Sequence, residues 1–269
     1  MSDPQVIPLP QVGENIREPL SAVQTAGVTQ PHRPVLLHQR FVNVPQEKIQ
    51  SKPRPLSDFL NRVILGDCVQ VMAAMPSASV DFVLTDPPYA ARYRDRSGRT
   101  VINDNGTAWL TPAFAQIARV LKDNRFCVSF YGWHKVDAFM AAWRAAGLRP
   151  RAHFVWIKRY ASGRNLTAYC HEQAYLLCKG EPPKPSMILR DVLDWRYTGN
   201  RYHPTQKPLM ALRPLIAAYS NPGDIILDPF AGSGTTVVAA KQLRRQYIAM
   251  ELETRYCKTA RERLSRIHS

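Results

Sequence analysis

The stretch VDFVLTDPPY, residues 80–89, decides the fold and marks a site. Its first six residues are mostly apolar and favour extended structure, which is typical of a short buried strand. The strand must end at Asp86, because Pro87 and Pro88 have no amide hydrogen to give to a neighbouring strand. In an open α/β sheet, ligands bind at the carboxyl ends of the strands. The stretch therefore predicts a carboxylate, two rigid carbonyls and the Tyr89 ring at the mouth of a site.

These groups suit a planar amine on a nucleobase. The Asp86 carboxylate and the Pro87 carbonyl can each accept one hydrogen from an exocyclic amino group, and Tyr89 can stack on the ring. The alternative is structural, with Asp86 as a turn residue before a proline pair. A second motif, described below, favours the first interpretation.

Composition and charge narrow the class of protein. A chain of 269 residues is long enough for one large domain or two small ones. The formal net charge of +15 favours a polyanionic partner, most often nucleic acid, over a simply basic protein. The five cysteines form no C-x-x-C pair, so we expect buried free thiols and no disulfide, zinc or other metal site. We also expect no membrane span and no signal peptide, hence a cytoplasmic protein.

Residues 1–55 differ from the rest, since prolines recur there and no hydrophobic period is sustained. We expect an extended or disordered arm, either inert or wrapped along the domain or a partner. Residues 56–269 predict the folded domain. Within it, segment 90–106 mixes arginines with a tyrosine, which suits a lid that orders on a phosphate backbone or, alternatively, a solvated loop. Segment 180–202 is Pro-rich and is predicted to be irregular.

Hydrophobic patterns predict alternating strands and helices in the domain. Besides the strand at 80–85, strands are expected at 62–65, 126–130, 153–157, 174–177, 225–228 and 247–251. Helices are expected at 68–75, from 111 onward, and at 134–146, 208–219 and 235–243.

The second motif is IILDPFAGSGTT, residues 225–236, which reads as a strand, a glycine turn and a helix. A further strand follows and ends in Glu251, and this order is typical of a nucleoside-cofactor half-site. The glycines let the backbone approach a ligand closely, and Glu251 can hold ribose hydroxyls. Neither G-x-G-x-x-G nor G-x-x-x-x-G-K-[ST] is present. The turn with Asp228 beside it suits a cationic amino-acid ligand such as S-adenosylmethionine.

The two motifs together resemble the amino-group DNA methyltransferases of the β arrangement, in which the catalytic half precedes the cofactor half. The resemblance extends from about Arg62 to Arg263, and further blocks match at Gly66-Asp67, at 155–158 and at HPTQKP, residues 203–208. It implies a Rossmann-like S-adenosylmethionine-dependent methyltransferase fold. The sheet would have seven strands, mainly parallel with one antiparallel strand, and helices on both faces.

The resemblance also implies roles for individual residues. The catalytic block would comprise Asp86, Pro87, Pro88 and Tyr89. The S-adenosylmethionine site would comprise Asp67 near the adenine, Glu251 at the ribose, Thr205 and Lys207 at the methionine carboxylate, and Asp228, Phe230, Gly232, Ser233, Gly234 and Thr235 at the glycine turn. The nearby His171, Glu172 and His203 are interpreted as structural. Basic residues expected on nucleic acid are Arg92, Arg94, Arg96, Lys158, Arg196 and Arg201.

The predicted activity is methyl transfer to the exocyclic amine of a flipped-out base in double-stranded DNA. Family members with Asp before Pro-Pro-Tyr mostly methylate adenine at N6, and those with Ser mostly cytosine at N4, so Asp86 favours adenine. The target-recognition insertion around 180–202 is short, which indicates a short site, a promiscuous enzyme or help from a homodimer partner. Methylation of RNA or of a protein amide, and a non-catalytic nucleic-acid-binding module, are the alternatives. A bacterial, archaeal or phage enzyme acting at the nucleoid, with or without a separate cognate restriction endonuclease, fits the resemblance.

Overall fold

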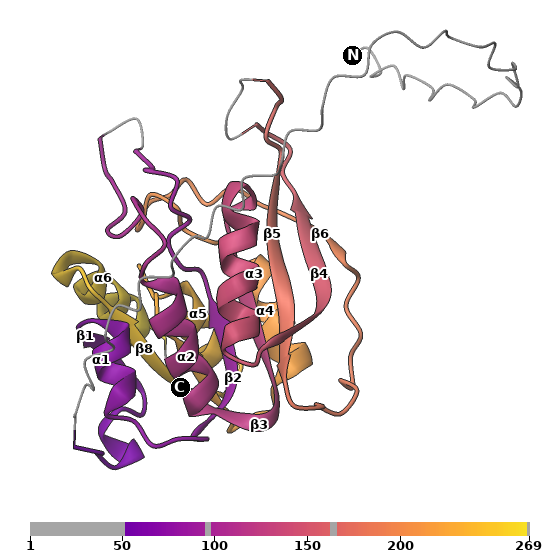
Figure 1. Ribbon diagram of the computed structural model, residues 1–269. Coiled ribbons are helices and arrows are strands. Elements are labelled where there is room, and N and C mark those ends of the chain that lie inside the picture. Colours follow the sequence, from indigo (N-terminus) through magenta and orange to yellow (C-terminus); the bar gives the residue numbers. More distant parts are fainter. Residues whose placement is uncertain (1–51, 95–97, 162–165, 268–269) are drawn as a thin grey trace, which may run out of the picture. The chain divides into compact units, whose positions relative to one another are not determined.

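The computed structural model describes residues 52–94, 98–161 and 166–267, which fold into an α/β domain (Figure 1). The predicted arm lies outside these ranges except for residues 52–55, and so does Arg96 of the predicted lid. In the described part of the chain, no helix is both long and apolar enough to cross a membrane.

The elements alternate along the chain as the hydrophobic pattern predicts, with two additions. The strands are β1 (Arg62–Leu65), β2 (Val80–Thr85), β3 (Leu121–Phe130), β4 (Arg149–Ile157), β5 (His171–Lys179), β6 (Val192–Asp194), β7 (Ile225–Asp228) and β8 (Gln246–Glu251). The helices are α1 (Cys68–Ala73), α2 (Leu110–Val120), α3 (Val136–Ala145), α4 (Leu209–Tyr219), α5 (Thr235–Gln242) and α6 (Thr254–Ser265), with short 3-10 turns η1 (Leu56–Asp58) and η2 (Trp133–Lys135). The pattern predicts all the strands and α-helices but β6 and α6.

Within the described residues, eight strands form one mixed sheet in the order β1-β8-β7-β2-β3-β5-β4-β6. β5 runs antiparallel to both neighbours, and the other adjacent pairs are parallel. The mainly parallel methyltransferase sheet with one antiparallel strand is confirmed, but it has eight strands where we predicted seven. The additional strand is β6, which pairs with β4 inside the segment 180–202. A three-residue strand is too short to leave a periodic signal in the sequence.

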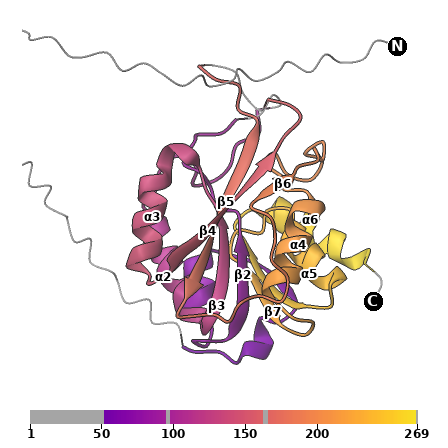
Figure 2. The same ribbon diagram turned by 90° about the vertical axis from the view of Figure 1, so that its right-hand side faces the viewer.

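Helices cover both faces of the sheet, as the resemblance implies (Figure 2). α1, α2 and α3 pack on one face around Trp143, while α4, α5 and α6 pack on the other around Leu215. The central strand β2 contributes to both layers, with Val83 on the first face and Phe82 on the second, because alternate side chains of a strand point to opposite faces. All five cysteines are free and four are buried, which confirms the prediction of buried thiols.

One charged residue lies at the buried start of the central strand. The Asp81 carboxylate is paired with Lys122 at 2.7 Å and Arg125 at 3.3 Å, and it accepts a hydrogen bond from the Ile225 amide at 3.0 Å. A buried carboxylate is tolerated when it is paired and hydrogen-bonded in this way. Asp81 thereby ties the amino ends of β2, β3 and β7 together, which fixes the relative positions of their carboxyl ends.

Four neighbouring parallel strands, β1, β8, β7 and β2, end at the same edge of the sheet. An acidic residue stands at each strand end or within two residues after it, namely Asp67, Glu251, Asp228 and Asp86. The topology therefore gathers carboxylates that are far apart in the sequence.

Candidate functional site

One pocket at this edge is lined by both sequence motifs. Its walls include Asp67, Asp86, Pro87, Pro88, Tyr89, Thr205, Lys207, Asp228, Phe230, Gly232, Ser233, Thr235 and Glu251. Of the residues predicted as catalytic or cofactor-binding, Gly234 alone is not part of the lining. The fold thus joins the catalytic turn, the glycine turn and the HPTQKP block in a single cavity.

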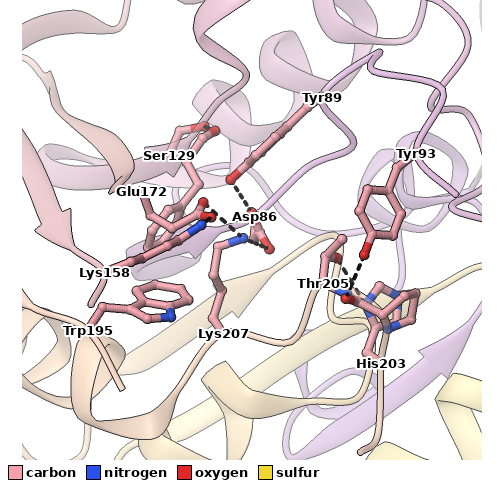
Figure 3. Close-up of polar contacts among 12 residues, drawn as sticks. Asp86, Tyr89, Tyr93, Ser129, Lys158, Glu172, Trp195, His203, Thr205 and Lys207 are labelled. Atoms are coloured by element: carbon pink, nitrogen blue, oxygen red, sulfur yellow. Dashed lines mark hydrogen bonds and ion pairs between the residues drawn. The ribbon is translucent and has the colours of Figure 1, made fainter. Parts of the chain in front are cut away.

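The Asp86 carboxylate is hydrogen-bonded on both oxygens (Figure 3). Oδ1 accepts a hydrogen bond from the Tyr89 hydroxyl at 2.9 Å, and Oδ2 lies 2.7 Å from the Lys207 ammonium. Burial raises the pKa of the Asp86 carboxyl, and the charge of Lys207 opposes this rise. Lys207 therefore favours the ionised form, which is the form that accepts two hydrogen bonds.

The Tyr89 residue is held at both ends. Its hydroxyl is committed to Asp86, and burial raises its pKa well above the ordinary value. Behind it, a Cβ added to Gly132 would lie 2.9 Å from both Cβ and the carbonyl oxygen of Tyr89. A glycine after β3 is thus required for the catalytic turn to pack against this strand.

Lys207 lines the pocket together with the predicted cofactor positions, and its ammonium contacts the catalytic half. It binds Asp86 and lies 3.9 Å from Oε2 of Glu172. Burial disfavours its charge, but the two carboxylates outweigh this effect and raise the pKa of Lys207. Glu172, which we interpreted as structural, therefore forms an ion pair with a residue that lines the pocket. No local sequence signal indicates this, because the contact depends on β5 running antiparallel beside β3.

We predicted that Lys158 contacts nucleic acid, but the structure places it in the interior. Its side chain is buried, forms an ion pair with Glu172, and is surrounded by the rings of Tyr160, Tyr169 and Trp195 at 5.8, 5.3 and 5.6 Å. The electron-rich face of an aromatic ring attracts a cation, so these three rings stabilise the Lys158 ammonium. The lysine follows β4 closely and turns inward, which the sequence alone does not reveal.

The cofactor half contains a carboxylate that clamps the glycine turn. Glu251 accepts a hydrogen bond from the Gly232 amide at 2.8 Å and another from the Glu253 amide at 2.7 Å. Gly232 has φ of +51°, a conformation that favours glycine. Burial raises the pKa of Glu251. The hydrogen bond from Gly232 thus holds the glycine turn next to the carboxyl end of β8.

Asp228 is buried at the end of β7 and accepts a hydrogen bond from the Phe230 amide at 3.1 Å. Burial raises the pKa of its carboxyl to about 7. The Phe230 ring packs edge-on against Trp109, with the ring centroids 5.1 Å apart. A cationic ligand near Asp228 would stabilise the ionised carboxylate and lower its pKa, since a nearby positive charge favours ionisation.

Ser233, Gly234 and Thr235 are anchored from outside the pocket. Arg263 of α6 donates to the Ser233 carbonyl at 2.6 Å, to the Ser233 hydroxyl at 3.1 Å and to the Thr235 hydroxyl at 3.2 Å. Gly234 has φ of +80°, and a Cβ there would lie 2.7 Å from Cβ of Ala260. These contacts shape the turn, and Arg263 is a supporting residue that the motif did not point to.

The remaining predicted cofactor positions lie at the rim. Asp67 caps α1 by accepting from the Val69 amide at 2.9 Å and the Gln70 amide at 3.1 Å. The Thr205 hydroxyl lies 3.1 Å from Nδ1 of His203, and burial lowers the pKa of that imidazole to about 3. His203 is therefore neutral and holds Thr205 in place.

In the described part of the segment 90–106, a buried carboxylate binds two backbone amides. Asp104 accepts hydrogen bonds from the Ala91 amide at 3.1 Å and the Tyr93 amide at 2.6 Å. Arg92 and Arg94 are exposed, as DNA contacts require. Their role on DNA stays a prediction.

The segment 180–202 is less available for reading DNA than we predicted. β6 belongs to the sheet, and Trp195 after it is buried with its indole nitrogen donating to the Tyr160 hydroxyl at 3.1 Å. Arg196 and Arg201 are exposed. The exposed part of the segment therefore supplies basic side chains, while Trp195 supports the network around Lys158.

Comparison with known proteins shows that the sequence is similar to those of DNA methylases. The family model of N6/N4 DNA methylases matches residues 80–262. The putative methylase YubD of Escherichia coli strain K12 is 50% identical over 208 residues, which is 77% of this chain and 92% of YubD. The type II methyltransferase M.HinfI of Haemophilus influenzae is 24% identical over 262 residues, covering 79% of this chain and 70% of M.HinfI.

Solved structures share the fold. The M1.HpyAVI complex with S-adenosylmethionine matches with a TM-score of 0.60 and 26% identity, covering 76% of this chain and 98% of that one. TTHA0409 of Thermus thermophilus, a putative DNA modification methylase also complexed with S-adenosylmethionine, matches with a TM-score of 0.60 and 24% identity over 77% of this chain and 93% of that one. The cytosine-N4-specific PvuII DNA methyltransferase matches with a TM-score of 0.62 and 17% identity over 77% and 87%. At their identities, the last two bear on the fold alone.

Proposed function

This chain belongs to the N6/N4 amino-group DNA methyltransferase family, and from this premise we propose that it methylates the N6 amine of a flipped-out adenine in double-stranded DNA, with S-adenosylmethionine as donor. The observation that supports the proposal most is that Asp86 and the glycine turn line the same pocket. Such a pocket can hold a methyl donor and a target amine side by side.

The cofactor half has the groups that S-adenosylmethionine requires. Gly232 exposes backbone without a side chain, and the Glu251 carboxylate beside it would accept hydrogen bonds from ribose hydroxyls. Asp228 would face a cationic ligand, and the rim residue Asp67 would lie toward the adenine. When bound, S-adenosylmethionine supplies an electrophilic methyl group. The residues of the chain bind and orient it.

The catalytic half would prepare the target amine. An exocyclic amine is a poor nucleophile because its lone pair is delocalised into the ring. Hydrogen bonds from its two N–H groups to Asp86 and to the Pro87 carbonyl would favour a pyramidal nitrogen with an available lone pair. Positioning of this kind contributes up to roughly 7–11 kcal/mol in well-oriented reactions, so Asp86 need not be a strong base.

The target base must leave the DNA duplex to enter this pocket, at a cost of a few kcal/mol. Tyr89 is suited to receive it, since the ring lines the pocket and its hydroxyl holds the Asp86 carboxylate in one orientation. Pro88 stiffens the turn between them. Stacking on Tyr89 would offset part of the cost of flipping.

Adenine is proposed as the base because Asp86 stands before Pro-Pro-Tyr, as in family members that mostly act on adenine. Cytosine N4 is the second candidate, since the cytosine-N4-specific PvuII enzyme shares the fold, and the fold therefore does not select the base.

The test is methyl transfer from labelled S-adenosylmethionine to unmethylated plasmid DNA, followed by modification-sensitive sequencing. The expected product is N6-methyladenine at defined sites. If the product is N4-methylcytosine instead, cytosine N4 and not adenine N6 is the target. Transfer to RNA or protein but not to DNA would overturn it, and binding of S-adenosylmethionine without any transfer would favour a non-catalytic module.

A further inference from the structure

A chain of alternating charges, two buried lysines and two partly buried carboxylates, runs from the core to the catalytic turn. Lys158 forms an ion pair with Oε1 of Glu172, Oε2 of Glu172 lies 3.9 Å from the Lys207 ammonium, and Lys207 lies 2.7 Å from Asp86 (Figure 3). Lys158 and Lys207 have only 4% and 7% of their side-chain surface exposed. Ammonium groups so deeply buried need a carboxylate partner at all times.

Lys207 therefore stands between two acceptors. It is hydrogen-bonded to Asp86, while the 3.9 Å to Glu172 is too long for a hydrogen bond. A displacement of about 1 Å would bring it within hydrogen-bond distance of Glu172. The lysine chain is flexible enough for such a movement. Since the Glu172 carboxylate lies on the other side of Lys207, the ammonium can leave Asp86 without becoming an unpaired buried charge.

The position of Lys207 on Asp86 conflicts with the proposed reaction. The target nitrogen becomes positively charged as it is methylated, and an ammonium held at Oδ2 of Asp86 would repel that charge. The same ammonium occupies an oxygen to which the amine would donate. Both conflicts are reduced when Lys207 moves toward Glu172, because the ammonium then no longer binds Oδ2 and Asp86 can stabilise the developing cation.

We propose that Glu172 is a positioning residue that takes over the Lys207 ammonium when a target amine binds Asp86. This inference rests on the proposed function and extends it. Lys158, held among the three rings of Tyr160, Tyr169 and Trp195, keeps Glu172 in place on the far side.

The test compares two variants that break the same ion pair. In Glu172→Gln the alternative acceptor loses its charge, so kcat for DNA methylation should fall at least about tenfold, the effect expected when coupling between contacting charged residues is lost. In Lys158→Met the carboxylate keeps its charge but loses the group that positions it, so kcat should fall less than in Glu172→Gln. Affinity for S-adenosylmethionine should be unchanged in both. A purely structural ion pair would make the two variants equally defective, and that result would overturn the proposal.

A double-mutant cycle completes the test. If Glu172 acts through Lys207, adding Glu172→Gln to a Lys207→Met enzyme should cost no more than about twofold in kcat. A full additional loss in that background, or wild-type turnover of Glu172→Gln, would overturn the inference while leaving the proposed function intact. Absence of methyl transfer by the wild-type protein would instead overturn the proposed function and this inference with it.

Discussion

The Lys207 ammonium lies 2.7 Å from Oδ2 of Asp86, although the two residues belong to sequence blocks that are far apart in the chain. Because the Lys207 side chain is buried, removal of the Asp86 charge is destabilising, since it takes away the nearest compensation of that ammonium. The catalytic turn and the HPTQKP block therefore act as one unit. Substitutions in either should be interpreted through their effect on the other.

The first prediction concerns Asp86. Asp86→Asn keeps the shape but loses one acceptor oxygen and the charge, so methyl transfer should fall by about 10²-fold or more. Affinity for S-adenosylmethionine should change only a few-fold, because Asp86 is proposed to face the target amine and not the cofactor. Single-turnover transfer and titration calorimetry measure the two effects. Lys207→Met combined with Asp86→Asn controls for the unpaired ammonium, and near wild-type transfer in Asp86→Asn would show that the catalytic assignment is wrong.

The second prediction concerns pH. Burial raises the pKa of Asp86 and Lys207 opposes the rise, so in Lys207→Met this pKa should rise further. An ionised Asp86 is needed to accept the amine, and the acidic limb of the pH–kcat/KM profile should therefore move to higher pH. Lys179→Met, at a half-buried lysine bonded to the Leu121 carbonyl, is the control and should leave the limb in place.

The same variant also decides between two roles of Lys207. If its partner is Asp86, affinity for S-adenosylmethionine should stay within a few-fold of wild type. A loss of about tenfold or more, equivalent to a charge-assisted hydrogen bond, would support the role at the methionine carboxylate instead.

The third prediction concerns the cofactor half. Gly232→Val forces a β-branched residue into φ of +51°, with its Cβ about 3.4 Å from the His203 ring, and should severely weaken binding of S-adenosylmethionine. Glu251→Ala should weaken it roughly tenfold or more, given about 1.5–3 kcal/mol for a hydrogen bond to a charged group. Gly223→Val is the matched control, since that glycine also has positive φ but no atom lies within 4 Å of its added Cβ. Unchanged calorimetric affinity in both site variants would contradict the assignment of this half-site.

The fourth prediction concerns Asp228, whose carboxyl has its pKa raised from 3.8 to about 7 by burial. Well below pH 3.8 the group is protonated in both folded and unfolded chains. As the pH rises the unfolded chain ionises first, so this carboxyl progressively destabilises the fold until about pH 7. Asp228→Asn removes the effect, and its Tm should exceed that of wild type by a margin that grows between these two values. If the difference in Tm between Asp228→Asn and wild type is the same at low pH as near pH 7, the pKa of Asp228 is not raised.

The fifth prediction concerns how DNA is held. If Arg92 and Arg94 contact phosphates, replacing both by alanine should flatten the dependence of log affinity on log salt by up to about two units, near 0.9 per phosphate. KM for DNA should rise while cofactor affinity and target sequence stay the same, because phosphate contacts position and base contacts specify. Replacing Arg196 and Arg201 should instead change which sites are methylated. Salt slopes and methylation maps for the two pairs measure this, and the reverse pattern would exchange the roles of the two segments.

The sequence by itself determined the framework of this protein. The apolar run before Asp86 and the proline pair after it define a buried strand and its end, and the glycines of the second motif define a turn that only glycine tolerates. These are local effects of backbone sterics and hydrophobic period, which need no knowledge of distant residues. The acids at the strand ends could be predicted for the same reason, since parallel strands direct their carboxyl ends to one edge.

Only the tertiary structure decided which charges meet. Lys158 and Lys207 each belong to a block that matches the family, yet one turns inward to Glu172 and the other binds Asp86. Glu172 reaches the site because β5 runs antiparallel in the sheet, and a pairing of strands distant in sequence leaves no local pattern. Side-chain direction and burial set the partners of a charged group, and both depend on the packing of the complete fold rather than on neighbours along the chain.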